Sequence, residues 1–173
     1  EVTEVFGTSG GAALYRRAML DAIGGFDTSF GVYLEDADVA WRARMAGWRC
    51  LLQPHAIVHH HHSATTKHRS DYKYFHVGRN RVRMLAKNAT LGHLVRYAPL
   101  IVLYDLAYVT YALAVDRSTA PIRGRIQGLR DWRRYRSAGH VRRPVQLAPA
   151  RGLRAALGRN AAVVPGGPGT AGT

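Results

Sequence analysis

The sequence predicts an α/β fold, because segments with the periodicity of helices alternate with short runs typical of strands. Residues 16–23 and 35–46 place apolar side chains at helical spacing, and glycine follows each segment, at Gly24 and Gly47. Glycine readily adopts the left-handed conformation that commonly ends a helix. We therefore expect two helices that end at these glycines.

Strands are predicted on either side of these helices. Residues 5–14 form a Gly- and Ala-rich apolar stretch, which predicts a strand or tight turn where another group can approach the backbone closely. Residues 48–53 and 56–59 are mainly apolar around Pro54, which predicts a strand, a kink and a second strand. Strands that follow a helix in this way are typical of α/β proteins.

Charge is unevenly distributed along the chain, whose net charge is +14. Residues 1–66 contain 5 Arg and Lys against 7 Asp and Glu, whereas residues 67–173 contain 20 against 4. Such a basic half is typical of proteins that bind nucleic acid or an anionic membrane, although an Arg-rich composition also follows from codon usage.

The single cysteine, Cys50, excludes an intrachain disulfide. A start at Glu1 without Met or leader predicts that the chain begins within a longer protein.

The most apolar part of the chain is residues 98–115, which is 18 residues long. This length is near the lower end of the roughly 17 to 25 residues that span a bilayer. Asp105 near the middle and Pro99 near the start disfavour a span, because a central Asp costs about 2.5 to 3.5 kcal/mol and proline weakens a helix. We expect a pair of helices at the membrane interface, with a spanning helix or a buried core helix as alternatives.

Basic and flexible segments follow the apolar stretch. Residues 117–143 carry nine arginines against one acid, and arginines beside an apolar helix are attracted to anionic lipid. Under the positive-inside rule this tract lies at the cytoplasmic face of the cell membrane. Residues 144–173 are rich in Ala, Gly and Pro and lack hydrophobic periodicity, which predicts a flexible tail.

Four motifs follow one another in the first half of the chain. Gly24-Gly25-Phe26-Asp27 precedes Glu35-Asp36-Ala37-Asp38, and an Arg-x-x-x-x-Gly-Trp sequence at 42–48 precedes a Pro-x-Ala-x-Val-x-His sequence at 54–60. This order resembles the second half of bacterial family 2 glycosyltransferases. The resemblance covers about residues 7–88.

The resemblance implies the acceptor-side half of a GT-A glycosyltransferase fold, which is Rossmann-like, followed by membrane-associated helices. It divides the chain into the C-terminal part of a catalytic domain at 1–90, apolar and Arg-rich helices at 91–143 and the tail at 144–173. The implied reaction transfers a sugar, with inversion, from a nucleotide-diphosphate donor to a lipid-linked or polysaccharide acceptor in cell-envelope biosynthesis. The similarity leans toward rhamnosyltransferases. Because the family's donor-binding half is missing, the chain alone is expected to be inactive.

Asp36 is the expected catalytic base. Sugar transfer with inversion needs a carboxylate that accepts the proton of the attacking hydroxyl group. The resemblance assigns this role to the second acid of the Glu35-Asp36 pair, and Glu35 would orient the acceptor or the base. The N-terminus of a helix also stabilises an ionised carboxylate. The alternative is that both acids only cap the helix.

Further residues are expected to contact the substrate. Asp38 either does so or pairs with Arg42 on the helix surface, four residues later. Trp41 either stacks on a sugar face or joins the core. In the family an Arg-Asn pair often follows on the next helix, and its arginine here can bind the leaving diphosphate or lie on a solvated basic face. The expected substrate-binding residues are Gly10, Gly11, Asp38, Trp41 and Arg79.

The histidines at 59–62 are candidate metal ligands. On a strand alternate residues share a face, so His60 and His62 would point the same way. The resemblance places the family's histidine at His60, where it helps to hold a divalent metal, Mg²⁺ or Mn²⁺, on the donor diphosphate. Both ions prefer oxygen, so the main ligands are expected in the missing D-x-D motif. Alternatively, the histidines line a polar cleft.

Two other classes of protein compete with this interpretation. A nucleic-acid-binding protein fits the charge, but nucleic acid is disfavoured because no zinc-finger, RNP or helix-turn-helix signature accompanies the arginines. An inactive membrane-associated remnant predicts lipid binding without sugar transfer.

Overall fold

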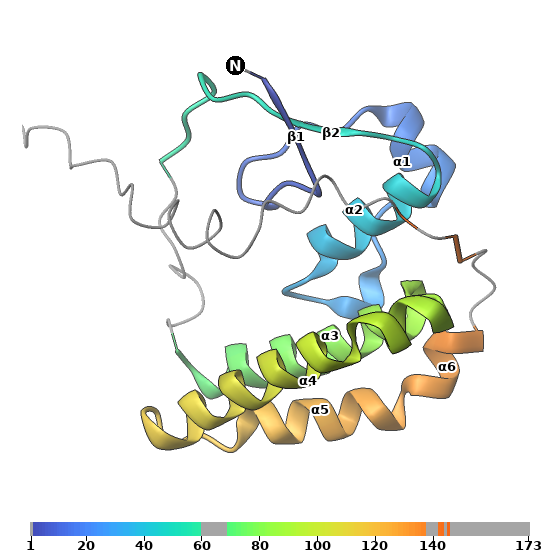
Figure 1. Cartoon of the computed structure of the whole chain (residues 1–173). Coiled ribbons are helices and arrows are strands. Elements are labelled where there is room, and N and C mark those ends of the chain that lie inside the picture. The colour runs from blue at the N-terminus through green and yellow to red at the C-terminus, as the bar shows by residue number, and fades with distance from the viewer. Residues whose placement is uncertain (1, 60–68, 138–141, 144, 146–173) are drawn as a thin grey trace, which may run out of the picture.

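The structure is a computed structural model that describes residues 2–59, 69–137, 142, 143 and 145. These residues are mostly helical, with one small sheet (Figure 1). In chain order the elements are β1 (Thr3–Val5), α1 (Arg17–Ile23), the 3-10 helix η1 (Thr28–Phe30), α2 (Glu35–Met45), β2 (Cys50–Leu52), α3 (Asp71–Asn88), α4 (Leu91–Ala114), α5 (Ala120–Arg130) and α6 (Trp132–Ser137).

The two helices predicted in the first half are confirmed as α1 and α2. Gly24 ends α1 with φ of 78°, and its N–H bonds back to the last turn, as the left-handed helix end requires. Gly47, with φ of 86°, follows α2. A core of Met19, Val39 and Ala43 joins the two helices.

The sheet corrects the predicted fold class. β1 pairs with β2 antiparallel, with Thr3 opposite Leu52, and no parallel pair occurs among the described residues. A parallel sheet needs helices on both faces, whereas β2 is largely exposed. The described chain is therefore mainly helical with a two-stranded ribbon, and it does not form a clear Rossmann-like half. Residues 53–59 are exposed and irregular, so the second predicted strand at 56–59 is absent.

The second half of the described chain is a layer of long helices. Figure 1 shows α3, α4 and α5 running alongside one another below the sheet, α1 and α2. α3 and α5 make the closest contact, because α5 presents Gly124 and Gly128 to the backbone of α3. A Cβ atom at Gly124 would lie 2.1 Å from the carbonyl oxygen of Phe75, so only glycine allows this approach.

The apolar stretch forms one continuous helix instead of the predicted pair. α4 begins after Thr90, whose hydroxyl accepts a hydrogen bond from the His93 N–H, and continues past Pro99 to Ala114. Proline removes one backbone hydrogen bond, to the carbonyl of Val95. Val95 and Pro99 are both exposed residues of α4. The boundaries predicted at 90 and 143 stay predictions.

Candidate functional site

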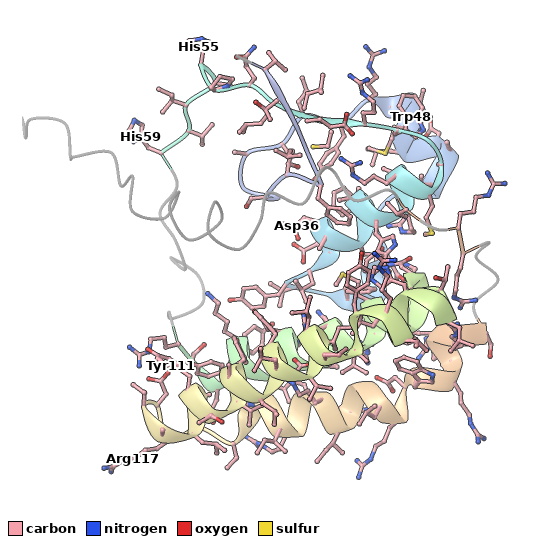
Figure 2. All side chains as sticks on the ribbon, in the orientation of Figure 1. Asp36, Trp48, His55, His59, Tyr111 and Arg117 are labelled. Atoms are coloured by element: carbon pink, nitrogen blue, oxygen red, sulfur yellow. The ribbon has the colours of Figure 1, made fainter. Side chains whose placement is uncertain are left out.

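Asp36 lies at the N-terminal end of α2, beside the loop that contains Gly10 (Figure 2). The Gly10 N–H donates to Asp36 Oδ2 at 2.9 Å, and the Ala37 N–H donates to Oδ1 at 2.7 Å. Each bond joins one carboxylate oxygen to a backbone N–H group, so together they fix the orientation of the Asp36 side chain. Each oxygen has a second lone pair, so Asp36 is able to accept a proton from a further group.

The loop between β1 and α1 approaches the start of α2 closely. A Cβ atom at Gly7 would lie 2.4 Å from the Ala40 Cβ, and one at Gly10 would lie 3.7 Å from Asp36 Oδ2. The close approach predicted for this Gly-rich stretch is therefore observed, and its neighbour is the acidic motif. Gly11 is exposed in the same loop. Its expected contact with substrate stays a prediction.

Glu35 stands next to Asp36 and Gly10. Its Oε2 atom is buried without a hydrogen-bond partner in the described part of the chain, and its Oε1 atom would lie 4.0 Å from a Cβ atom added at Gly10. A buried carboxylate oxygen without a partner is uncommon, but an acceptor hydroxyl has no access to it in this structure. The orienting role expected for Glu35 stays a prediction.

The turn before the two acids has an unusual backbone that α3 holds in place. Tyr33 and Leu34 adopt φ of 69° and 65°, a left-handed conformation that is uncommon for side chains of this size. The buried Asn80 amide donates to the carbonyl oxygens of Phe30, Val32 and Tyr33, at 2.8 to 2.9 Å. Asn80 therefore fixes the turn that presents Glu35 and Asp36.

Arg79 supports the same turn. Its guanidinium donates to the Phe30 carbonyl at 3.0 Å and to Asn80 Oδ1 at 3.0 Å. It also lies 3.0 Å from His76 Nδ1, and burial together with the neighbouring Arg79 and Arg83 lowers the pKa of His76. In this structure Arg79 binds protein groups, and its expected contact with a diphosphate stays a prediction.

Asp38 and Trp41 lie in the interior, on the side of α2 away from solvent. Asp38 is fully buried, and it accepts hydrogen bonds from Arg42 at 2.8 Å and from Asn88 at 2.8 Å. The pair with Arg42 is confirmed, but it is buried and not on the helix surface as predicted. The Trp41 ring packs edge-on against Phe6 at 6.2 Å, which favours the core role.

Lys87 joins two of the sequence motifs. Its buried Nζ atom donates to Asp27 Oδ2 at 2.7 Å and to Asp38 Oδ2 at 3.0 Å. Burial alone would raise the pKa of Asp27, but hydrogen bonds from Lys87 and Ser29 outweigh it and lower the pKa to about 2. The sequence analysis missed this network, because Lys87 lies 60 and 49 residues from its two partners in the sequence.

The predicted metal ligands His60 and His62 lie outside the described residues. Figure 2 shows His55 and His59 on the irregular segment that leads toward them. Because this segment is not a strand, strand alternation no longer distinguishes His60 from His59. No group of three His, Cys, Asp or Glu side chains able to hold a metal ion occurs within residues 2–59 and 69–137. The described residues therefore do not form a metal site by themselves, and the histidine roles stay predictions.

Comparison with known proteins gives a partial match. The chain is 40% identical over 58 residues to the N-acetylglucosaminyl-diphospho-decaprenol L-rhamnosyltransferase of Mycobacterium tuberculosis, in strains CDC 1551 and H37Rv. The match covers 34% of this chain and 19% of that enzyme. No protein-family model and no solved structure matches the chain. Over these 58 residues the chain is related to a glycosyltransferase.

Proposed function

We propose that this chain provides the acceptor side of an inverting glycosyltransferase, with Asp36 as its general base. The observation that carries the proposal is the pair of backbone N–H groups on the Asp36 carboxylate at the start of α2. These bonds fix the direction of the carboxylate, and a general base must be held in place beside the hydroxyl group that it deprotonates. The partial match to a rhamnosyltransferase supports the same reaction class.

In the proposed reaction, an Asp36 oxygen takes the proton of an acceptor hydroxyl group as that oxygen attacks the anomeric carbon of the donor sugar. The bond from the anomeric carbon to the diphosphate breaks, and the nucleotide diphosphate leaves with the electron pair. Attack on the face opposite the leaving group inverts the anomeric configuration. Glu35, which precedes Asp36 at the start of α2, is the candidate to orient the acceptor.

The substrates are inferred from the relative. Its name describes transfer of L-rhamnose to a diphospho-decaprenol-linked N-acetylglucosamine. We infer a nucleotide-diphosphate sugar as donor and a lipid-linked or polysaccharide acceptor, with transfer at the cytoplasmic face of the cell membrane. The donor, and a divalent metal if one is used, would bind mainly to the part of the enzyme that this chain does not contain. His60 and His62 are candidates to complete that metal site.

The test is a transfer assay with a radiolabelled sugar nucleotide, using an enzyme in which these residues are joined to a donor-binding half. Asp36→Asn is nearly isosteric but cannot accept the proton, so kcat should fall about a hundred- to ten-thousand-fold with donor binding retained. Asp21→Asn, which removes an exposed acid on α1, is the matched control and should keep full activity. The 173 residues alone should transfer no sugar.

Retention of more than about a tenth of kcat in Asp36→Asn would contradict the proposed base, given the range expected for general-base catalysis. Glu35→Gln would then be the next variant to measure. Turnover by the 173 residues alone would show that the donor site lies within this chain, against the proposal.

A further inference from the structure

The outer side of α4 is a continuous apolar surface. Between Ala98 and Val115 the only charged residue is Asp105. Leu100, Leu103 and Leu106 are 61 to 65% exposed, and only 6% of the most apolar 18-residue window is buried. An apolar surface of this length is unusual on a protein in water and marks a site of association. We call it the α4 surface, and its large exposed side chains are Leu91, Val95, Leu100, Val102, Leu103, Tyr104, Leu106, Tyr111, Leu113 and Val115.

Asp105 does not interrupt this surface, because it faces the protein. Its Oδ1 atom accepts from Arg81 of α3 at 2.9 Å and from Arg125 of α5 at 2.6 Å. Asp116, just beyond the end of α4, is likewise bonded to Arg69 and to the Tyr74 hydroxyl. The two acids nearest the α4 surface are therefore neutralised from the inner side of the helix layer.

Free positive charge lies at both ends of the surface. Arg96 near the start of α4 and Arg117 just after its end are exposed, and neither forms an ion pair within the described residues. Figure 2 shows Tyr111 above and Arg117 below the C-terminal end of α4. Aromatic and basic side chains that flank an apolar face are typical of helices at a membrane interface.

We propose that the α4 surface lies flat on an anionic membrane, with its leucines among the acyl chains and Arg96 and Arg117 at the phosphate groups. A spanning orientation is disfavoured because α3 and α5 pack against the inner side of α4. They are attached through charged side chains, including Arg81 and Arg125. Insertion of α4 across the bilayer would either break these ion pairs or carry the arginines into the hydrocarbon.

This proposal is independent of sugar transfer and is tested with the 173-residue chain and lipid vesicles. Sedimentation should show binding to vesicles that contain phosphatidylglycerol and weaker binding to pure phosphatidylcholine. Leu103→Glu/Leu106→Glu should reduce the partition coefficient at least about a hundredfold, since it places two charges where two apolar side chains would enter the bilayer. Arg96→Gln/Arg117→Gln should reduce binding to the anionic vesicles by about fivefold per arginine, with little effect on the neutral ones.

The matched control is Ala18→Glu/Ala22→Glu, which adds the same two charges to exposed positions on α1. It should bind vesicles like the wild type. Circular dichroism would show that each variant keeps its helices. Equal binding by the leucine variant and by this control would overturn the proposal.

A second measurement determines the orientation of α4. In a Cys50→Ser background, cysteines at Val95, Leu106 and Leu113, all exposed along one side of α4, would carry a fluorophore quenched by lipids with spin labels at known depths. A flat helix predicts the same shallow depth for all three labels. A deep label at 106 between two shallow ones would indicate a spanning helix and overturn the proposal. Self-association in the absence of lipid without vesicle binding would assign the surface to a second copy of the chain instead.

Discussion

Lys87 of α3 places its Nζ atom 3.0 Å from Oδ2 of Asp38 in α2, and both side chains are buried. The same ammonium group lies 2.7 Å from Asp27 Oδ2 in the turn after α1. One cation therefore connects three segments that lie 11 to 60 residues apart in the sequence. Asp27 and Asp38, the last acids of the two acidic motifs, are therefore bound to the same cation.

Lys87→Met should strongly destabilise the fold. It preserves much of the apolar stem but leaves Asp38 buried with one cation fewer, and loss of one partner of a buried pair costs about 3 to 5 kcal/mol. Urea unfolding, followed by circular dichroism, measures the change. Lys73→Met is the control on the same helix, since Lys73 lies over the Tyr33 ring at 5.7 Å and forms no ion pair within the described residues, and about 1 kcal/mol or less is expected. Similar losses for the two variants would contradict the proposed role of Lys87.

The stability of the fold should depend on the ionisation of Asp27. Its pKa is about 2 in the folded chain against an ordinary value of 3.8. Because the folded pKa is the lower one, this contribution is fully present above pH 3.8 and is lost as the pH falls toward about 2. Asp27→Asn should therefore show a shallower fall in the free energy of unfolding across this range than the wild type.

Urea unfolding at stepwise pH values measures this difference. Asp21→Asn removes an exposed acid of α1 and is the matched control. If Asp27→Asn keeps the full pH dependence of the wild type, the charged pair with Lys87 is not the source of the effect.

The helices were predictable because their signals are local. Apolar spacing and a following glycine specify α1 and α2 without reference to the rest of the chain. The burial of Asp38 was not predictable, because a charged residue has the hydropathy of a surface residue whatever its partners are. Its partners Lys87 and Asn88 lie 49 and 50 residues away.

The sheet and α4 were predicted less well, for two different reasons. Strand propensity identified the region of β2, but the pairing with β1 depends on a segment 45 or more residues away in the sequence. Pro99 and Asp105 indicated a break in α4, yet each is tolerated for a reason outside its own segment. Pro99 lies on the exposed side of α4. Asp105 forms ion pairs with Arg81 of α3 and Arg125 of α5.

Asn80→Asp should disorder the turn before Glu35 and Asp36. The substitution keeps the shape but replaces the amide N–H groups with a carboxylate oxygen that faces the carbonyls of Phe30, Val32 and Tyr33. We expect a loss of about 3 kcal/mol or more, because the carbonyls of Val32 and Tyr33 lose the Asn80 donor, Phe30 keeps only Arg79, and a negative charge is buried. Amide hydrogen exchange across residues 31–37 should also become faster.

Gln127→Ala is a suitable control for this variant, since it removes another side-chain amide, at a half-buried position on α5. It should cost about 1 kcal/mol, the usual contribution of one hydrogen bond, and leave exchange in the turn unchanged. Wild-type exchange rates in Asn80→Asp would mean that packing alone holds the turn.

Gly124→Ala should separate α3 from α5. The added methyl group would lie 2.1 Å from the Phe75 carbonyl oxygen and 3.0 Å from the Arg79 nitrogen, and both are backbone atoms that cannot move without the helix. Overpacking of this kind costs about 1 to 3 kcal/mol, which outweighs the gain in helix propensity. Gly92→Ala is the matched control in the first turn of α4, where nothing lies within 4 Å of the added methyl group, and there alanine should stabilise by about 0.5 to 1 kcal/mol. The two variants should therefore shift the urea midpoint in opposite directions. A shift in the same direction would mean that α3 and α5 do not pack backbone to backbone at Gly124.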